Sequence, residues 1–153
     1  MIREVSDKDL EQAINLVRDV YLEFVADDYS EQGKISFEAY LQEKLHEASA
    51  GLKSEEKRIW AYYQSDEMLG VIATQETSHI ALVFVDKHHH KQEIAPAMIN
   101  FVLEELKKNE NVTRVTLNSS FYAVKAYEHM GFVIEGEQQE KDGIVFISMV
   151  CEL

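Results

Sequence analysis

The spacing of apolar residues divides the chain into helical and extended segments. In the first third, apolar residues recur every three or four positions, which is typical of helices that bury one face. One such set is Leu10, Ile14, Val17, Tyr21 and Phe24, and the next is Phe37, Tyr40, Leu41, Leu45 and Ala48. Ser6 and Ser36 are the expected N-caps of these two helices, and Gly51 is the expected stop of the second. A short strand at residues 1–5 is predicted to precede them.

The middle of the chain has strand-like patterns instead. Residues 58–63 and 68–76 are predicted antiparallel strands joined by a turn at residues 65–67. Residues 79–85 are nearly all apolar, which indicates a central strand covered on both faces. A helix is predicted next, with Pro96 in its first turn. Its apolar stripe consists of Ile94, Met98, Phe101, Val102 and Leu106.

The last third returns to short elements. Residues 112–118 are a predicted strand, and residues 122–130 are a short helix that ends at Gly131. Residues 132–139 and 145–153 are predicted strands, and the Asp142-Gly143 pair favours a tight hairpin between them. The predicted order is βααβββαβαββ, a mixed α/β fold with helices on both faces of a mostly antiparallel sheet that contains one parallel crossover. Since no repeat or linker interrupts this order, residues 1–153 are predicted to form a single domain.

Charge and cysteine content narrow the class of protein. The net charge of -13 argues against nucleic-acid binding, because phosphates attract clustered Lys and Arg. No stretch approaches the roughly 20 continuous apolar residues of a membrane span. The first residues lack the layout of a signal peptide, and the single Cys151 fits a reducing compartment, so we expect a cytoplasmic protein. An acidic surface concentrates protonated amines, although solubility explains the charge equally well.

Polar residues stand where the predicted strand 112–118 ends. Asn118 is the last residue of that strand, at a position where α/β folds commonly bind ligands. Its amide can donate and accept hydrogen bonds together, which suits a ligand that contains amides. Tyr127 shares a helical face with Ala123 and Met130, so its hydroxyl group could reach the same crevice. A tyrosine on an apolar helical face is, however, more often a core residue with a satisfied hydroxyl group.

The segment from Asn118 to Phe132 resembles the GNAT acetyltransferase family. Members carry an Asn at this strand end and a Tyr before Glu-x-x-Gly-Phe, and the matching residues here are Asn118, Ala123, Tyr127, Gly131 and Phe132. The resemblance extends over the full chain, and residues 23–29 and 139–144 are similar to one bacterial branch of the family. It implies one acyl-CoA N-acyltransferase domain at residues 1–153, with acetyl-CoA as cosubstrate. It further implies a small-molecule or peptide amine as acceptor. From the charge and the lack of a long apolar stretch we expect no nucleic-acid or membrane partner, and the sequence is compatible with a homodimer.

The resemblance also assigns residues to the cosubstrate. By the resemblance, we expect the pantetheine arm to pair like an extra strand with the backbone of Phe84 and Val85, near Asn118 and Ser120. The resemblance implies that the hydroxyl group of Tyr127 lies by the sulfur atom and protonates the departing thiolate. The amine attacks the thioester directly in a ternary complex, without a covalent enzyme intermediate.

The phosphate-binding loop departs from the family pattern. Members read Arg or Gln, Gly, x, Gly, x, then Gly or Ala, and the matching run here is His90, Lys91, Gln92, Glu93, Ile94 and Ala95. Both earlier glycines are missing, although glycines allow the backbone to approach phosphate closely at a helix start. Lys91 adds a cation, whereas Glu93 adds a carboxylate where the diphosphate should lie. We expect weakened binding of the cosubstrate. The altered loop leaves two alternative functions open. One is a noncatalytic acyl-CoA-binding or regulatory module, and the other, with less support, is an interaction domain with no ligand.

Acceptor-side residues are harder to predict. Glu76 and His79 flank the start of the cosubstrate-facing strand and are candidates for the general base. Glu23 and Tyr29 lie on the segment expected to cover the acceptor, although ordinary surface roles fit them too. The run 88–90 of three histidines predicts no metal site, because no Cys, Asp or Glu cluster completes a ligand set.

Overall fold

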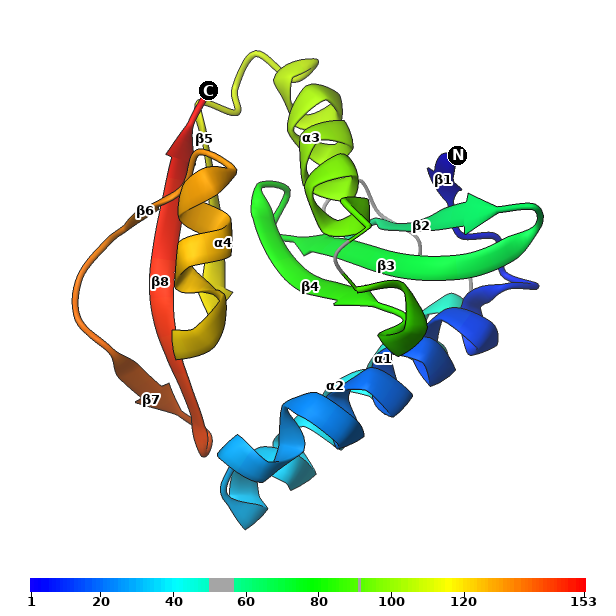
Figure 1. Cartoon of the computed structure of the whole chain (residues 1–153), viewed down its shortest axis with the longest axis horizontal. Coiled ribbons are helices and arrows are strands. Elements are labelled where there is room, and N and C mark those ends of the chain that lie inside the picture. Colours follow the sequence, from blue (N-terminus) through cyan, green and yellow to red (C-terminus); the bar gives the residue numbers. More distant parts are fainter. Residues whose placement is uncertain (50–56, 91) are drawn as a thin grey trace.

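The computed structural model describes residues 1–49, 57–90 and 92–153 (Figure 1). The elements follow in the order β1 (Ile2–Glu4), α1 (Leu10–Phe24), η1 (Ala26–Asp28), α2 (Glu31–Ser49), β2 (Ile59–Gln64), β3 (Glu67–Gln75), β4 (His79–Val85), η2 (Lys87–His89), α3 (Ile94–Lys107), β5 (Arg114–Ser119), η3 (Phe121–Ala123), α4 (Val124–His129), β6 (Val133–Ile134), β7 (Gln139–Lys141) and β8 (Ile144–Glu152). No helix among the described residues is long and apolar enough to cross a membrane.

The strands form one sheet in the order β1-β2-β3-β4-β5-β8-β6, and β7 pairs with β8 off this path. Every pair of neighbouring strands is antiparallel except β4 and β5. Parallel neighbours need a crossover connection, and α3 supplies it between β4 and β5. The predicted mixed α/β fold with one parallel crossover is therefore confirmed.

Helices cover both faces of the sheet, with α1 and α2 on one side and α3 on the other (Figure 1). Because neighbouring side chains of a strand point to opposite faces, Val71 and Ile72 of β3 pack into different cores. The core beneath α1 and α2 includes Ile14, Val17, Phe37, Leu41 and Val71. The core beneath α3 includes Trp60, Ile72, Met98, Ile99 and Val102. Each core consists largely of the apolar stripes that periodicity predicts.

A bulge in β4 opens the sheet. Ala73 of β3 pairs with Leu82, but Thr74 pairs with Ile80, so Ala81 is an extra residue between the two registers. Such an insertion bends its strand. Beside it, β4 pairs with β5 only at His79 and Ile80. The two strands diverge beyond that point, as Figure 1 shows.

Two predicted helix starts are wrong. Helix α2 begins at Glu31 rather than after Ser36, because the Ser30 hydroxyl group accepts a hydrogen bond of 3.1 Å from the backbone N–H of Gly33 and caps the helix. Ser36 instead donates to the carbonyl oxygen of Asp142 at 3.1 Å. Helix α1 begins at Leu10, and the carbonyl oxygen of Ser6 accepts a hydrogen bond in the preceding turn. The predicted stop at Gly51, like the side chains of Leu45 and Ala48, lies outside the described residues.

The end of the chain differs in one strand. The strand predicted over residues 132–139 is only Val133–Ile134, and Gln139–Lys141 forms a separate strand after Gly136, whose φ is +89°. The observed order is thus βααβββαβαβββ. The hairpin predicted at Asp142-Gly143 is confirmed, since both residues have left-handed φ values of +53° and +81°.

Candidate functional site

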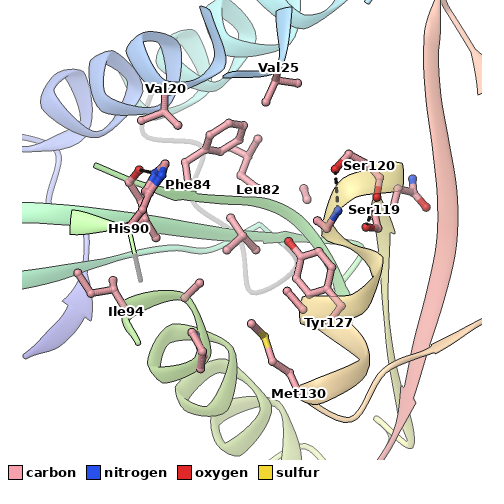
Figure 2. A pocket seen from close by; sticks show the side chains of 18 of the residues that line it. Val20, Val25, Leu82, Phe84, His90, Ile94, Ser119, Ser120, Tyr127 and Met130 are labelled. Atoms are coloured by element: carbon pink, nitrogen blue, oxygen red, sulfur yellow. Dashed lines mark hydrogen bonds between the residues drawn. The ribbon is translucent and has the colours of Figure 1, made fainter. Parts of the chain in front are cut away.

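A cavity of about 530 Å³ lies where β4 and β5 diverge (Figure 2). Strand β4 lines it from Ala81 to Val85, α1 contributes Val20, and the start of α3 closes one end. The short helix α4 contributes Tyr127, and Met130 follows it. Most of its walls are apolar, as in sites that take the hydrocarbon part of a ligand.

Tyr127 points from α4 into this cavity, toward β4 (Figure 2). Its ring makes an edge contact with the fully buried ring of Phe132, with centroids 6.1 Å apart. The carbonyl oxygen of Tyr127 also accepts a hydrogen bond of 3.0 Å from the N–H of Phe132. Burial raises the pKa of the Tyr127 hydroxyl group to about 12, so the group keeps its proton at neutral pH. The ring is therefore held against Phe132, and its protonated hydroxyl group can donate a hydrogen bond into the cavity.

Strand β5 ends in polar residues between the cavity and solvent. Asn118 lines the cavity, and its Oδ1 atom accepts a hydrogen bond of 3.2 Å from the Ser148 hydroxyl group on β8. Ser119 is buried and donates to the carbonyl oxygen of Ser120 at 2.6 Å. The Ser120 hydroxyl group accepts from the N–H of Ala123 at 3.3 Å and begins the turn that leads to α4. Asn118 from β5 and Tyr127 from α4 thus line the same cavity.

The start of α3 forms the far end of the cavity. Ile94 and Ala95 bring first-turn amides there, whereas Pro96 has no N–H group to offer. Glu93, immediately before the helix, has a left-handed φ of +62°. This conformation favours glycine, so the structure puts Glu93 where the loop pattern expects one. Its side chain is exposed and lines the cavity.

The loop before α3 is held by histidines. The Nε2–H group of His90 donates to the carbonyl oxygen of Val85 at 2.8 Å, and its ring lies 5.1 Å from that of Phe24. His89 bonds Asp86 at 2.8 Å, and this bond holds the pKa of that carboxyl below its usual value. Among the described residues, no group of three or more His, Cys, Asp or Glu side chains could hold a metal ion.

A second cavity of about 360 Å³ meets the first. Both are lined by Ala81, the bulged residue, and by Tyr29, Phe37, Leu82, Asn118, Ser119 and Ser120. The second extends to His79 and to the β7–β8 hairpin. The Nδ1 atom of His79 is hydrogen-bonded to the Thr116 hydroxyl group at 2.8 Å. Burial lowers the pKa of His79, and nearby Glu76 only partly opposes this, so the ring is neutral at pH 7.

Comparison with known proteins identifies the family to which the chain belongs. A family model described as the acetyltransferase (GNAT) domain matches residues 25–153. The chain belongs to the GNAT family. Members of this family are acetyltransferases that use acetyl-CoA.

Solved GNAT structures share the whole fold. The GCN5-related N-acetyltransferase of Rhodopseudomonas palustris has a TM-score of 0.78 at 18% identity, covering 100% of this chain and 95% of that one. The PaiA N-acetyltransferase of Thermoplasma acidophilum, in complex with coenzyme A, has a TM-score of 0.78 at 17% identity, covering 100% and 98%. A mutant of the spermidine N-acetyltransferase SpeG from Vibrio cholerae has a TM-score of 0.72 at 17% identity, covering 99% and 94%. No curated protein sequence matches the chain. At these identities the likeness establishes the GNAT fold.

Within this GNAT fold, most of the predicted site residues line one or both cavities. Those that line the first cavity are Phe84, Val85, His90, Glu93, Ile94, Ala95, Asn118, Ser120 and Tyr127. Tyr29 lines both cavities, and His79 lines the second. Gln92 is exposed and lines neither, and Lys91 lies outside the described residues.

Glu76 and Glu23 are not brought to the cavities. Glu76 is exposed in the turn between β3 and β4, with a φ of +51°, and lines neither cavity. Glu23 forms an ion pair of 3.1 Å with Lys87 and lines a different groove. Glu76 was predicted as a general base and Glu23 as an acceptor-side residue, because each lies beside an expected site segment. In the structure both side chains lie on the outer surface.

Several residues that line the second cavity were not predicted from the sequence as site residues. Phe37 and Tyr40 fit the buried stripe of a helix, and Phe146 fits a strand, yet all three line the second cavity. Apolar spacing carries no signal that separates a cavity wall from a packed core, because both kinds of position carry apolar side chains. The cavity wall can be told from the core only in the folded protein, where the β7–β8 hairpin is hydrogen-bonded to Ser30 and Ser36 at the start of α2.

Proposed function

We propose that this GNAT member is an N-acetyltransferase that transfers the acetyl group of acetyl-CoA directly to an amine, with residues 1–153 as its one acyltransferase domain. One observation carries the proposal: a cavity with Tyr127 in its wall and the start of α3 at its end meets a second cavity at Asn118–Ser120. Two substrates can therefore approach one point from two sides.

The first cavity has suitable groups for the cosubstrate. The apolar walls at Phe84 and Val85 suit the pantetheine arm, and the side chain of Asn118 suits its amides. The amides of Ile94 and Ala95 begin a helix and favour the diphosphate. The carboxylate of Glu93 opposes the same charge, so binding is weaker than a glycine at this position would allow.

The residues around the junction supply the proton transfers. The amine nitrogen attacks the thioester carbonyl carbon, a C–N bond forms and the C–S bond breaks. Tyr127 gives its hydroxyl proton to the thiolate that leaves, and solvent returns a proton to Tyr127. His79 accepts the proton that the amine loses, directly or through water. The tautomer that fits this role has Nδ1–H donating to Thr116, which leaves Nε2 as the proton acceptor.

The test combines binding and turnover. Calorimetric titration of the purified chain with acetyl-CoA should give heat, and a panel of amines should release free thiol. No heat at millimolar acetyl-CoA would overturn the proposal.

A noncatalytic acyl-CoA-binding module is the second candidate, because Glu93 weakens the phosphate site. Binding of acetyl-CoA without thiol release for any amine would assign the chain to that class.

A further inference from the structure

We infer that the acceptor is a small monoamine with an aromatic or apolar body, rather than a polyamine. This inference rests on the proposed acetyltransferase function and specifies its acceptor. The second cavity carries it, because that cavity extends away from α3, where the diphosphate of the cosubstrate is proposed to bind.

The walls of the second cavity have almost no net charge. Among the described residues that line it, Lys141 and Asp142 are the ones with formal charges, and their charges cancel. Both are exposed on the β7–β8 hairpin at the rim. His79, which also lines the cavity, is neutral at pH 7 because burial lowers its pKa. A second ammonium group of a polyamine would thus lose water without gaining a dedicated carboxylate, which is costly.

Aromatic side chains form much of the remaining wall. Phe37 lies at their centre, with its ring centroid 6.2 Å from that of Tyr29 and 6.3 Å from that of Tyr40. Phe146 on β8 also lines the cavity. Flat rings of this kind bind apolar and aromatic groups, and their faces attract a single ammonium group. The volume of about 360 Å³ lies within the range of small-molecule sites.

The acidic residues that precede Tyr29 lie outside this cavity. Asp27 and Asp28 are exposed in η1, and neither lines either cavity. The net charge of -13 raises the local concentration of any protonated amine. This general attraction brings monoamines and polyamines alike to the entrance. The uncharged aromatic interior then selects between them.

The decisive experiment compares acceptors in the thiol-release assay at saturating acetyl-CoA. The panel consists of 2-phenylethylamine, tryptamine, methylamine, putrescine, spermidine and a short peptide with a free N-terminal alanine. We expect kcat/KM for 2-phenylethylamine to exceed that for spermidine by about tenfold or more. A preference for putrescine, spermidine or the peptide would overturn this inference and leave the acetyltransferase function standing. Bound acetyl-CoA with no turnover of any amine would overturn both.

Phe146→Ala tests the wall itself. It should lower the ratio of kcat/KM for 2-phenylethylamine to that for methylamine by about tenfold, because methylamine is too small to use the ring. The ratio is independent of any loss of folded protein. Ile35→Ala, which changes an exposed residue of α2, is the matched control and should leave the ratio unchanged. An unchanged ratio in Phe146→Ala would contradict the proposed aromatic site.

Discussion

The hydroxyl group of Ser30 donates a hydrogen bond of 3.1 Å to the carbonyl oxygen of Gly143. Ser30 caps α2 and Gly143 lies in the β7–β8 hairpin, 113 residues later. Gly33 lies against the same hairpin, and a Cβ atom added to it would lie 2.4 Å from the carbonyl oxygen of Gly143. Because α2 carries Phe37 and β8 carries Phe146, this contact holds together two walls of the second cavity.

Gly33→Ala should therefore impair the acceptor side selectively. The added methyl group must displace backbone, at a cost of about 1–3 kcal/mol of folding free energy. We expect a higher KM for the amine and little change in the Kd for acetyl-CoA, as measured by steady-state kinetics and calorimetry. Gly136→Ala is the control: its φ of +89° also strains alanine, but nothing lies within 4 Å of the added Cβ. An equal rise in the amine KM for both variants would show that the Gly33 contact has no special role.

Glu93→Gly should strengthen both the fold and cosubstrate binding. Glycine accommodates the φ of +62°, which should stabilise the protein by about 0.5–1 kcal/mol in thermal unfolding. Removing the carboxylate from the start of α3 should also tighten the Kd for acetyl-CoA by about fivefold or more. Glu76→Gly is a close control, since Glu76 has the same charge and a φ of +51° but lines neither cavity. It should raise stability alone, and a matching gain in affinity would move the phosphate site away from α3.

Tyr127→Phe should lower kcat by about 10²-fold or more, the scale expected for loss of a general acid. The Kd for acetyl-CoA should change little, because the ring still fills its place against Phe132. Since burial raises the pKa of Tyr127 to about 12, the wild-type rate should not fall through loss of this proton below about pH 11. Tyr122→Phe, at a tyrosine that is 79% exposed nearby, should retain full activity. Equal turnover in wild type and Tyr127→Phe would exclude this proton-transfer role.

His79 should give the pH–rate profile its acidic limb. The base must be neutral to accept a proton, and burial lowers the pKa of His79 below 6.5. Activity should thus be lost as pH falls through that lowered pKa, and kcat/KM should be level around pH 7. His79→Gln should abolish the limb and lower the rate, whereas His129→Gln, at an exposed residue of α4, should do neither. Retention of the same limb in His79→Gln would assign the base elsewhere.

Local sequence patterns predicted most of the fold. The run 79–85 is strand β4 with the predicted bounds, and the Asp142-Gly143 pair forms the predicted hairpin. Ser36 failed as a helix start because Ser30 caps α2, and Ser30 is held by Gly143, which lies far away in the sequence. The predicted strand 132–139 is interrupted because the chain turns at Gly136 and forms a separate pairing with β8.

The candidate site, like the fold, was predicted from the sequence only in part. The sequence by itself placed Asn118 at the end of a strand before a short helix, one residue short of the observed end of β5 at Ser119. The family resemblance pointed to Tyr127 and to the altered loop at Glu93. Only the tertiary structure decided that β4 leaves β5 at the Ala81 bulge, and that Tyr29, Phe37 and Phe146 line one cavity together with His79. The physical reason is that periodicity indicates which side chains avoid water. It does not indicate which distant element covers them, or whether that element leaves room for a substrate.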